Sequence, residues 1–443
     1  MFEDATIVKG GGRRCCTLGR LVLAVMLAAG AGRPVLATWS IVIVDTRSGE
    51  IAVGSATCLT GFDLQAELPV VIPDVGAACA QALVDFNAVN RMQIHQGLLD
   101  GLRPEEILSI LETGDPFHQS RQYGIADVRG RTLTFSGADT LSFAGGVTGQ
   151  VGTIVYAIQG NILTGSPVIS AAEEAVRNTP GGLPEKLMAG MEAAYAMGGD
   201  GRCSCPLLEP TECGSPPPIF DKSAHVGFMI VSRTGDTAGV CTAELGCANG
   251  DYYLDIDIAG QQESDPDPVL QMRERFDAWR AGLIGVPDAV QSTVTIDPPE
   301  LTGDGTGQAV MMITLRDWQD TPVTDGAWSV TVTHAADSAG LATIGPVTDN
   351  GGGVFSVMLD GGLGAGVDRF QVTASGPGRP VTLIPLPELV SFAPLDLDRD
   401  RDVDADDYAA WRSCLGGPFM PPVSGCEGAD GDGDGDADLD DFG

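Results

Sequence analysis

Positive charge is scarce in this chain. Its 443 residues include 25 Lys and Arg against 60 Asp and Glu, so the formal charge is −35. Nucleic acids and anionic membranes are bound mainly through Lys and Arg, and both are therefore excluded as partners. Metal cations are the expected counter-ions of so acidic a protein.

Long apolar runs are also lacking, because no segment reaches the about 20 apolar residues of a membrane-spanning helix. The short run Leu21–Ala31 follows several Lys and Arg residues and precedes a small-residue site ending at Ala37. This pattern is typical of an export signal. We expect residues 1–37 to be a signal peptide cut after Ala37, with a cut after Ala31 as the alternative. Export predicts a protein that is secreted, periplasmic or on the cell surface.

Histidine is rare, and none of the four lies in a Gly-x-Ser-x-Gly or His-Glu-x-x-His motif. This excludes two common classes of hydrolase site. The cysteines fit export, since most of those beyond residue 37 should pair in an oxidising compartment. The cysteines between 203 and 247 have zinc as an alternative, but they lack paired Cys-x2-Cys spacing. Their number beyond residue 37 is odd, so one thiol should stay unpaired.

The length predicts two or three domains at about 150 residues each. Residues 38–284 combine short β-rich runs, such as Thr38–Asp45 and Ile51–Thr57, with paired helical segments. We therefore expect an α+β layered domain there. Alternating strands with Gly, Pro and Asp turns over 288–386 predict an all-β sandwich, which resembles the Ig-like domains of invasins. It contains no catalytic cluster and is expected to be a spacer or adhesion module.

Acidic residues repeat near the C-terminal end with an offset of 34 positions. Carboxylates at positions 1, 3, 5 and 12 of a loop can wrap one Ca²⁺. The expected metal ligands are Asp396, Asp398, Asp400, Asp402 and Asp407 in the first copy, and Asp430, Asp432, Asp434, Asp436 and Asp441 in the second. The sharp turn at position 6 favours glycine. It is Gly435 in the second copy but Arg401 in the first, which should bind more weakly.

This duplicated pattern over 394–443 resembles dockerin modules, except that it ends at Gly443, before a second helix. The resemblance implies a small, truncated α module that binds Ca²⁺ and docks a cohesin-like protein partner. Cys414 and Cys426 lie between the loops and are expected to form a disulfide. A solvated acidic tail is the alternative interpretation.

The main chemical candidate is Thr38, provided that cleavage makes it the N-terminal residue. Its α-amine, with a pKa of about 8, would then lie beside its own hydroxyl and serve as general base. One residue can thus supply both nucleophile and base. No rival catalytic triad is present in the sequence of this domain.

The blocks TWSIVIVD, GEIAVGSAT, VGAACAQAL, RQYGIAD, QGNIL, GGDGR and YYLDIDIAGQQESDPDPV resemble, in order, those of domain-of-unknown-function family 1028, over nearly all of residues 38–284. That family is placed among the N-terminal-nucleophile (Ntn) hydrolases. The resemblance implies an αββα sandwich with Thr38 as nucleophile, no cofactor for this domain, and an unknown small-molecule or peptide substrate. Its matching positions suggest catalytic roles for Asn161, Gln159, Asp200 and Arg202. They also suggest substrate-binding roles for Ser40, Gln81, Arg121 and Gln122.

Two functions follow from these observations. One is an exported hydrolase of an amide or related acyl bond, docked by a calcium-binding tail. The other is a non-enzymatic extracellular binding or adhesion protein that keeps the Ntn fold as a scaffold, because a fold needs no active nucleophile.

Overall fold

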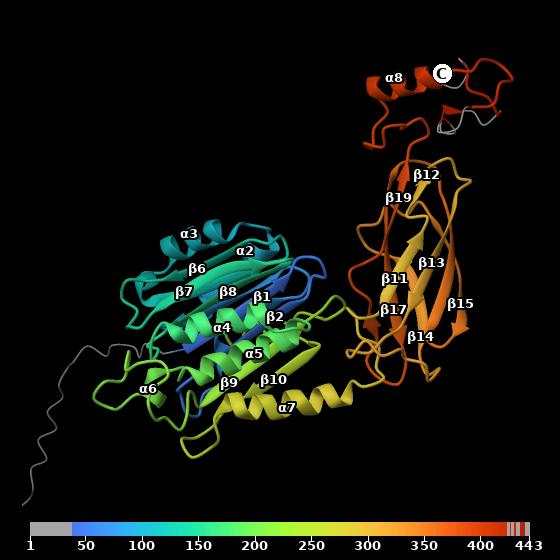
Figure 1. The fold of residues 1–443 in the computed structure, drawn as a ribbon. Helices are drawn as coiled ribbons and strands as arrows, with labels where there is room; N and C mark the ends of the chain where they lie inside the picture. The colour runs from blue at the N-terminus through green and yellow to red at the C-terminus, as the bar shows by residue number, and fades with distance from the viewer. Residues whose placement is uncertain (1–37, 423–425, 427–428, 431–434, 439–443) are drawn as a thin grey trace, which may run out of the picture. The chain divides into compact units, whose positions relative to one another are not determined.

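The computed structural model describes residues 38–422, 426, 429–430 and 435–438. It contains a mixed α/β domain, an all-β sandwich and a C-terminal segment with one helix (Figure 1). The predicted signal peptide, residues 1–37, lies outside the described residues. None of the helices in the described ranges is long and apolar enough to cross a membrane.

The mixed domain is centred on a six-stranded antiparallel sheet with the order β10-β9-β2-β1-β8-β7. Its strands are β1 (Thr38–Asp45), β2 (Ile51–Thr57), β7 (Gly145–Val151), β8 (Ile154–Asn161), β9 (Val226–Ser232) and β10 (Leu254–Ile258). The predicted ranges of β1 and β2 are confirmed. Every residue of β1 and β2 is buried, because the sheet is covered on both faces.

A second, four-stranded sheet packs against one face of the first and has the order β3-β4-β5-β6. Its strands are β3 (Pro69–Ile72), β4 (Gly76–Ala82), β5 (Arg121–Asp127) and β6 (Thr132–Ser136). The outer face of the six-stranded sheet is covered by helices α4 (Pro167–Asn178), α5 (Leu183–Ala196) and α7 (Pro268–Gly282) (Figure 1). The outer face of the four-stranded sheet is covered by α2 (Val89–Leu99) and α3 (Pro104–Gly114). The domain therefore has four layers: helix, sheet, sheet, helix.

The space between the two sheets changes from apolar to polar along β1. Trp39 and Ile41 face the helices, whereas Val42 faces the second sheet. Because side chains alternate along a strand, Thr38 and Ser40 share the inter-sheet face with Val42. The first residues of the domain thus bring hydroxyl groups between the sheets.

Neighbouring strands contribute further polar side chains at this end. We call the whole set the inter-sheet polar cluster, and each member is at most 1% exposed: Thr38, Ser40, Ser55, Thr57, Gln81, Gln122, Gln159 and Asn161. These side chains come from β1, β2, β4, β5 and β8. Buried polar groups are tolerated when they are hydrogen-bonded, and Ser40, Gln81 and Gln122 bond within this cluster. Gln159 Oε1 has no hydrogen-bond partner in the described part of the chain.

The sandwich has two sheets, with the orders β11-β13-β16-β15 and β12-β19-β17-β14. Its strands are β11 (Thr293–Asp297), β12 (Glu300–Thr302), β13 (Gln308–Thr314), β14 (Ser329–His334), β15 (Thr343–Gly351), β16 (Val354–Asp360), β17 (Gly366–Ser375), β18 (Val381–Thr382) and β19 (Glu388–Phe392). Alternate residues of β13 (Ala309, Met311 and Ile313) point into its core. Strand β19 pairs with β17, so the sandwich extends beyond the predicted boundary at 386.

The C-terminal segment contains helix α8 (Ala405–Cys414). Trp411 is 1% exposed and packs against Ala429 and Ala437, and its indole Nε1 donates a hydrogen bond to the Ala429 carbonyl oxygen at 3.2 Å. The predicted Cys414–Cys426 disulfide is confirmed. Helix α8 is thus tied to the second acidic repeat.

Disulfides also join six of the seven other described cysteines. The remaining pairs are Cys58–Cys203, Cys205–Cys213 and Cys241–Cys247, and Cys79 stays free. The zinc alternative for the cysteines between 203 and 247 is therefore wrong, because each of them is disulfide-bonded.

Strands β3 and β7 lie outside the predicted ranges. Strand β3 has four residues and begins at Pro69, and β7 is rich in glycine, which has a low strand propensity. Tertiary packing requires at least one of these glycines. A Cβ at Gly149 would lie 2.1 Å from the Tyr156 hydroxyl of the paired strand β8. Pairing therefore overrides low local propensity in β7, whereas β3 is rich in Val and Ile but is only four residues long.

Gly124→Ala should destabilise the mixed domain. A Cβ at Gly124 would lie 2.0 Å from Gln159 Oε1, so the Gln159 amide would have to leave its place in the polar cluster. We expect a loss of roughly 1–3 kcal/mol in unfolding free energy. Urea unfolding read by hydrogen exchange in peptides from β5 and β8 measures this loss. Gly282→Ala is the matched control, because a Cβ there meets nothing within 4 Å and its stability should not fall.

Candidate functional site

Thr38 lies at the start of β1, opposite Asn161 of β8. It is 1% exposed in the chain that still carries residues 1–37. Its hydroxyl Oγ1 donates a hydrogen bond to Thr57 Oγ1 at 3.3 Å, and Thr57 is the last residue of β2. The predicted nucleophile therefore has a defined partner on the neighbouring strand.

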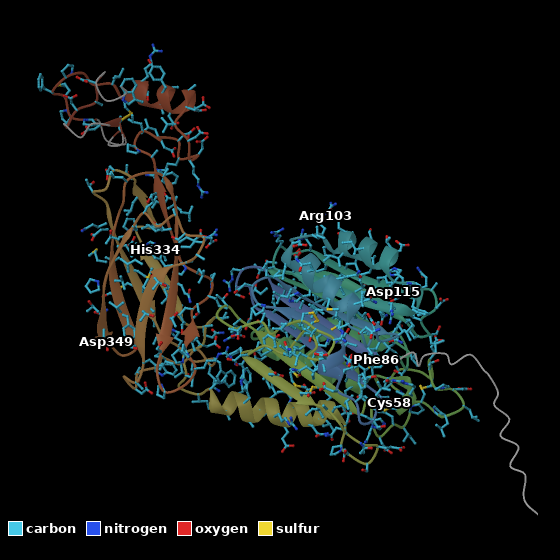
Figure 2. The ribbon with its side chains drawn as sticks, turned by 180° about the vertical axis from the view of Figure 1, so that it is seen from behind. Cys58, Phe86, Arg103, Asp115, His334 and Asp349 are labelled. Carbon is cyan, nitrogen blue, oxygen red and sulfur yellow. A yellow bond between two sulfur atoms is a disulfide. The ribbon has the colours of Figure 1, made fainter. Side chains whose placement is uncertain are left out.

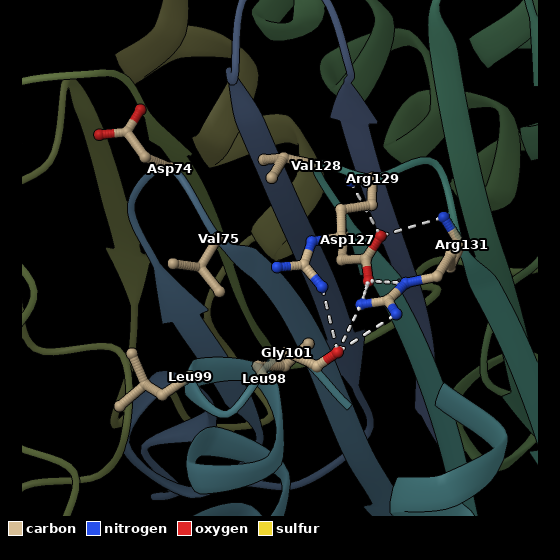
Figure 3. Close-up of a pocket in the computed structure, with 9 residues that line it drawn as sticks. All are labelled: Asp74, Val75, Leu98, Leu99, Gly101, Asp127, Val128, Arg129 and Arg131. Carbon is tan, nitrogen blue, oxygen red and sulfur yellow. Dashed lines mark hydrogen bonds and ion pairs between the residues drawn. The ribbon is translucent and has the colours of Figure 1, made fainter. Parts of the chain in front are cut away.

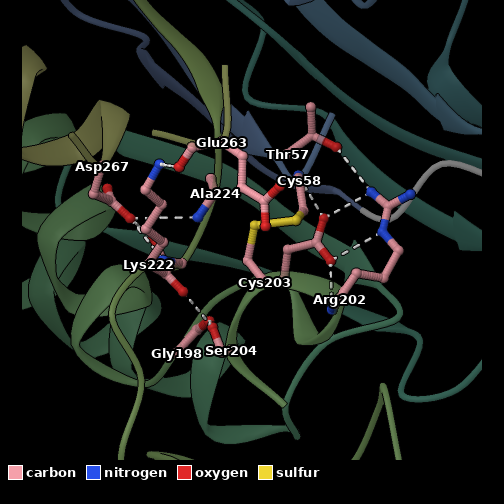
Figure 4. Close-up of a disulfide and its surroundings, with 12 residues drawn as sticks. Thr57, Cys58, Gly198, Arg202, Cys203, Ser204, Lys222, Ala224, Glu263 and Asp267 are labelled. Carbon is pink, nitrogen blue, oxygen red and sulfur yellow. Dashed lines mark hydrogen bonds and ion pairs between the residues drawn. A yellow bond between two sulfur atoms is a disulfide. The ribbon is translucent and has the colours of Figure 1, made fainter. Parts of the chain in front are cut away.

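Thr57 is held in turn by the Asp200–Arg202 ion pair. Arg202 Nη2 lies 3.3 Å from Thr57 Oγ1 and 2.8 Å from Asp200 Oδ2. The same Asp200 Oδ2 accepts a hydrogen bond from the Cys58 backbone N–H at 2.7 Å. The Cys58–Cys203 disulfide joins these two segments covalently (Figure 4). Asp200 and Arg202 thus reach Thr38 through Thr57.

A glycine turn brings Asp200 to this position. Gly198 and Gly199 follow α5 and have φ values of 95° and 56°, a region that favours glycine. A Cβ at Gly199 would lie 2.5 Å from the Trp39 ring, so only glycine lets the turn pack against the start of β1. The sequence Gly-Gly-Asp therefore places a carboxylate beside the end of β2.

The amides of the polar cluster bind one another rather than an open pocket. Gln81 Nε2 donates to Gln122 Oε1 at 2.7 Å and to the Thr38 carbonyl oxygen at 2.9 Å. Ser40 Oγ donates to Gln81 Oε1 at 2.6 Å and accepts from Gln159 Nε2 at 3.0 Å. These bonds connect the two sheets directly under Thr38.

Arg121 is separated from the other predicted site residues. It precedes Gln122 on β5 and therefore points to the opposite face, towards α2 and α3. Its guanidinium Nε pairs with Asp115 at 2.7 Å, at the end of α3 (Figure 2 labels Asp115), and it also donates to the Leu83 carbonyl oxygen. The structure does not bring Arg121 to Thr38.

Cys79 is the one free thiol among the described cysteines, and it lies between the sheets. Burial raises the pKa of Cys79 to about 12, although a hydrogen bond with Ser40 opposes the shift. The thiol therefore stays protonated at neutral pH and is not a competing nucleophile.

A small cavity of about 130 Å³ lies elsewhere in the mixed domain, beside Asp127 and Arg131 (Figure 3). Arg131 pairs with Asp127 and, together with Arg129, donates to the Gly101 carbonyl oxygen. Ligand pockets usually enclose about 300–1,000 Å³. This cavity is too small for a substrate, and its polar groups serve the protein itself.

Sequence reasoning does not identify Thr57 or the Cys58–Cys203 disulfide as parts of the site. The available signal was the alternation in IAVGSAT, which puts Ser55 and Thr57 on one face of β2. That alternation does not show that the face meets Thr38. The contact depends on the pairing of β1 with β2 and on a disulfide that spans 145 residues.

The acidic repeats have matching local geometry. The Arg401 N–H donates to Asp396 Oδ2 at 3.1 Å, and the Gly435 N–H donates to Asp430 Oδ2 at 3.0 Å, which is the same bond in both copies. Both position-6 residues have positive φ, 85° for Arg401 and 97° for Gly435. The predicted ligands Asp432, Asp434 and Asp441 lie outside the described residues.

Carboxylates of the first loop form two groups of three. Oxygens of Asp396, Asp398 and Asp400 lie within 4.8 Å of one another, and those of Asp402, Asp404 and Asp407 do likewise. Asp396 is 6% exposed, and its Oδ1 has no hydrogen-bond partner in the described part of the chain. The charge of Asp400 raises the pKa of Asp402. These residues fit Ca²⁺, which would take the orphaned oxygen and relieve the repulsion.

Replacing both Cys58 and Cys203 by Ser should lower the unfolding free energy by roughly 4–5 kcal/mol, because this disulfide closes a long loop of the unfolded chain. The Cys205→Ser, Cys213→Ser pair is the control. Its cysteines are 8 residues apart, and the expected loss is roughly 2–3 kcal/mol. Urea unfolding without reductant measures both, and equal losses would contradict the loop-closure argument.

Comparisons with known proteins agree with two of the resemblances. Residues 38–206 match a family of unknown function, DUF1028, and residues 288–392 match domain 3 of invasin. No curated protein matches the chain. The disulfides and the invasin-type domain are consistent with an extracellular or surface location.

Three solved structures are similar to parts of the chain. A Silicibacter pomeroyi protein of the DUF1028 family has 18% identity and a TM-score of 0.39, over 55% of this chain and 88% of that one. The Yersinia pseudotuberculosis adhesin InvE has 24% identity and a TM-score of 0.20, over 23% and 26%. The Escherichia coli adhesin FdeC has 11% identity and a TM-score of 0.20, over 62% and 58%. Residues 38–206 thus match DUF1028, and an invasin-type sandwich follows them.

Proposed function

We propose that residues 38–284 form an N-terminal-nucleophile hydrolase that cleaves an amide or related acyl bond through Thr38. The observation that carries the proposal is the hydrogen bond from the Thr38 hydroxyl to Thr57, which the Asp200–Arg202 pair holds in place. The four-layer arrangement and a family match that begins at residue 38 support it.

The chemistry requires a free amine on Thr38. Removal of residues 1–37 supplies it, and the neutral amine then takes the hydroxyl proton as Oγ1 attacks the substrate carbonyl carbon. The tetrahedral intermediate collapses to an acyl ester on Thr38, and the leaving amine departs with the proton held by the Thr38 ammonium. Water then attacks the ester, with the same amine as base, and releases the acid and the free hydroxyl.

The surrounding residues receive distinct roles in this proposal. Asn161 is the register partner of Thr38, and we assign its amide to the developing oxyanion, where losing one donor costs a factor of about 10²–10³ in rate. Gln159 donates to Ser40, so it acts as a positioning residue. Gln81 positions Thr38 itself by binding its carbonyl oxygen. Substrate-binding roles for Ser40, Gln81 and Gln122 would require these buried bonds to open.

The alternative is an extracellular binding protein that uses the mixed domain as a scaffold. The match of residues 288–392 to an invasin domain favours this alternative. The two functions make opposite predictions for Thr38, because a scaffold does not need its hydroxyl or a free amine.

We also propose that the segment 394–443 is a dockerin-like module that binds two Ca²⁺ and a cohesin-like partner. The repeated bond from position 6 to the first aspartate supports two equivalent loops. The orphaned Asp396 Oδ1 supports a cation in the first loop.

Thr38→Ala should abolish acyl transfer, whereas Thr38→Ser should keep part of it, because the hydroxyl and the amine remain. A panel of acyl amides and an acylating probe, read by mass spectrometry of the N-terminal peptide, measures this. Thr148→Ala is the matched control, since Thr148 is exposed on β7. A mature N-terminus at Gly32, or equal inertness of wild type and Thr38→Ala, would favour the scaffold.

Arg401→Gly should tighten Ca²⁺ binding to the first loop by about tenfold, because a side chain at positive φ is strained. Arg401→Gln removes the charge but keeps the backbone strain, so its gain in Ca²⁺ affinity should be smaller than that of Arg401→Gly. Asp396→Asn should weaken the same loop. Calorimetric titration of the full chain with calcium chloride measures all three, and an absence of calcium heat in the wild type would contradict the module.

A further inference from the structure

A second and larger cavity lies beside the disulfide that holds Thr57. It encloses about 460 Å³ and is lined in part by Arg202, Cys203, Lys222 and His225 (Figure 4 shows the first three). This volume is within the range of about 300–1,000 Å³ that is usual for small-molecule sites. Arg202 connects the cavity to Thr57, and through Thr57 to the Thr38 hydroxyl.

Lysine is so rare in this chain that the position of Lys222 is informative. The chain has only three lysines, Lys9, Lys186 and Lys222. Lys186 is buried and donates to the carbonyl oxygens of Val176 and Thr179 around the end of α4. Lys222 instead lines the cavity, and its ammonium group donates to the backbone carbonyl oxygen of Glu263.

Lys222 has no carboxylate partner among the residues that the structure describes, although the chain carries a formal charge of −35. An unpaired cation at a cavity wall attracts an anion. Arg202 adds a second guanidinium group on the wall, with its side chain 26% exposed.

His225 contributes a buried polar group that the protein does not satisfy. It is 8% exposed, and its Nδ1 has no hydrogen-bond partner in the described ranges. Burial, followed by the charge of Lys222, lowers the pKa of His225, so the ring is neutral at pH 7. A neutral imidazole can bind a polar ligand without adding charge.

We propose that this cavity binds the carboxylate of the substrate, and that the substrate class is an N-acyl amino acid. This inference rests on the proposed hydrolase function, because it names what Thr38 would cleave. Lys222 and Arg202 recognise the carboxylate, and the apolar walls at Ile219 and Phe220 contact the acyl group. Asp221 and Glu263 also line the cavity, so a dianionic phosphate meets more repulsion than a single carboxylate does.

Calorimetric binding to the exported Thr38→Ala protein tests the proposal without turnover. The probes are hippurate (N-benzoylglycine), its neutral carboxamide and inorganic phosphate. Hippurate should bind about tenfold or more tightly than the carboxamide, and phosphate should be the weakest, because a hydrogen-bonded charge pair is lost in the carboxamide. Equal affinities for hippurate and its carboxamide, or tightest binding by phosphate, would overturn the proposal.

Variants of Lys222 separate recognition from folding. Lys222→Met should weaken hippurate binding about tenfold, whereas Lys222→Arg should retain it. Arg103→Met is the matched control, since Arg103 is an exposed cation on the mixed domain (Figure 2), and it should bind like the parent. Unchanged binding by Lys222→Met with an unchanged Tm would contradict the site. If the wild-type protein binds hippurate as expected but does not hydrolyse it, the hydrolase function is rejected and the binding site is retained.

Discussion

The mutual hydrogen bonding of the amides between the two sheets is the constraint on which the candidate site depends. An unsatisfied buried polar group costs roughly 1–3 kcal/mol, so Gln81, Gln122 and Gln159 are stable there only as a connected set. One bond of that set goes to the Thr38 carbonyl oxygen. The strand that carries the proposed nucleophile is therefore held by both sheets.

A second constraint acts on the Thr38 hydroxyl through Thr57. Three contacts converge on this region: the Asp200–Arg202 pair, the bond from the Cys58 N–H to Asp200, and the disulfide to Cys203. Arg202 also lines the cavity that contains Lys222. Arg202 therefore contacts Thr57 and lines the cavity at the same time.

The acidic repeats follow a local constraint. A backbone N–H at position 6 can reach the aspartate at position 1 when the chain turns sharply, and this turn has positive φ in both copies. Gly435 adopts it freely, whereas Arg401 adopts it with strain. The loop geometry is therefore the same in both copies although the residue is not.

The sequence alone determined the features that depend on neighbouring residues. Strands β1 and β2, the duplicated aspartate spacing and the reactivity that Thr38 would have as an N-terminal residue are all local properties. Alternation along β5 likewise implies that Arg121 and Gln122 face opposite ways. It does not say which face meets the other sheet. The family resemblance suggested a substrate-binding role for Arg121, but the structure pairs it with Asp115, away from Thr38.

Only the tertiary structure decided which distant residues meet Thr38 and what surrounds them. Thr57 lies 19 residues away in sequence, and the bond that joins Cys58 to Asp200 spans 142 residues. Strand β7 forms because β8 pairs with it, despite the weak strand propensity of its glycines. Lys222 lines a cavity together with residues such as Arg202 and His225, which the fold brings to it. Such contacts arise from strand pairing and from the stacking of layers. A residue pattern specifies the periodicity of a strand or helix, but it does not specify which other strand or helix packs against it.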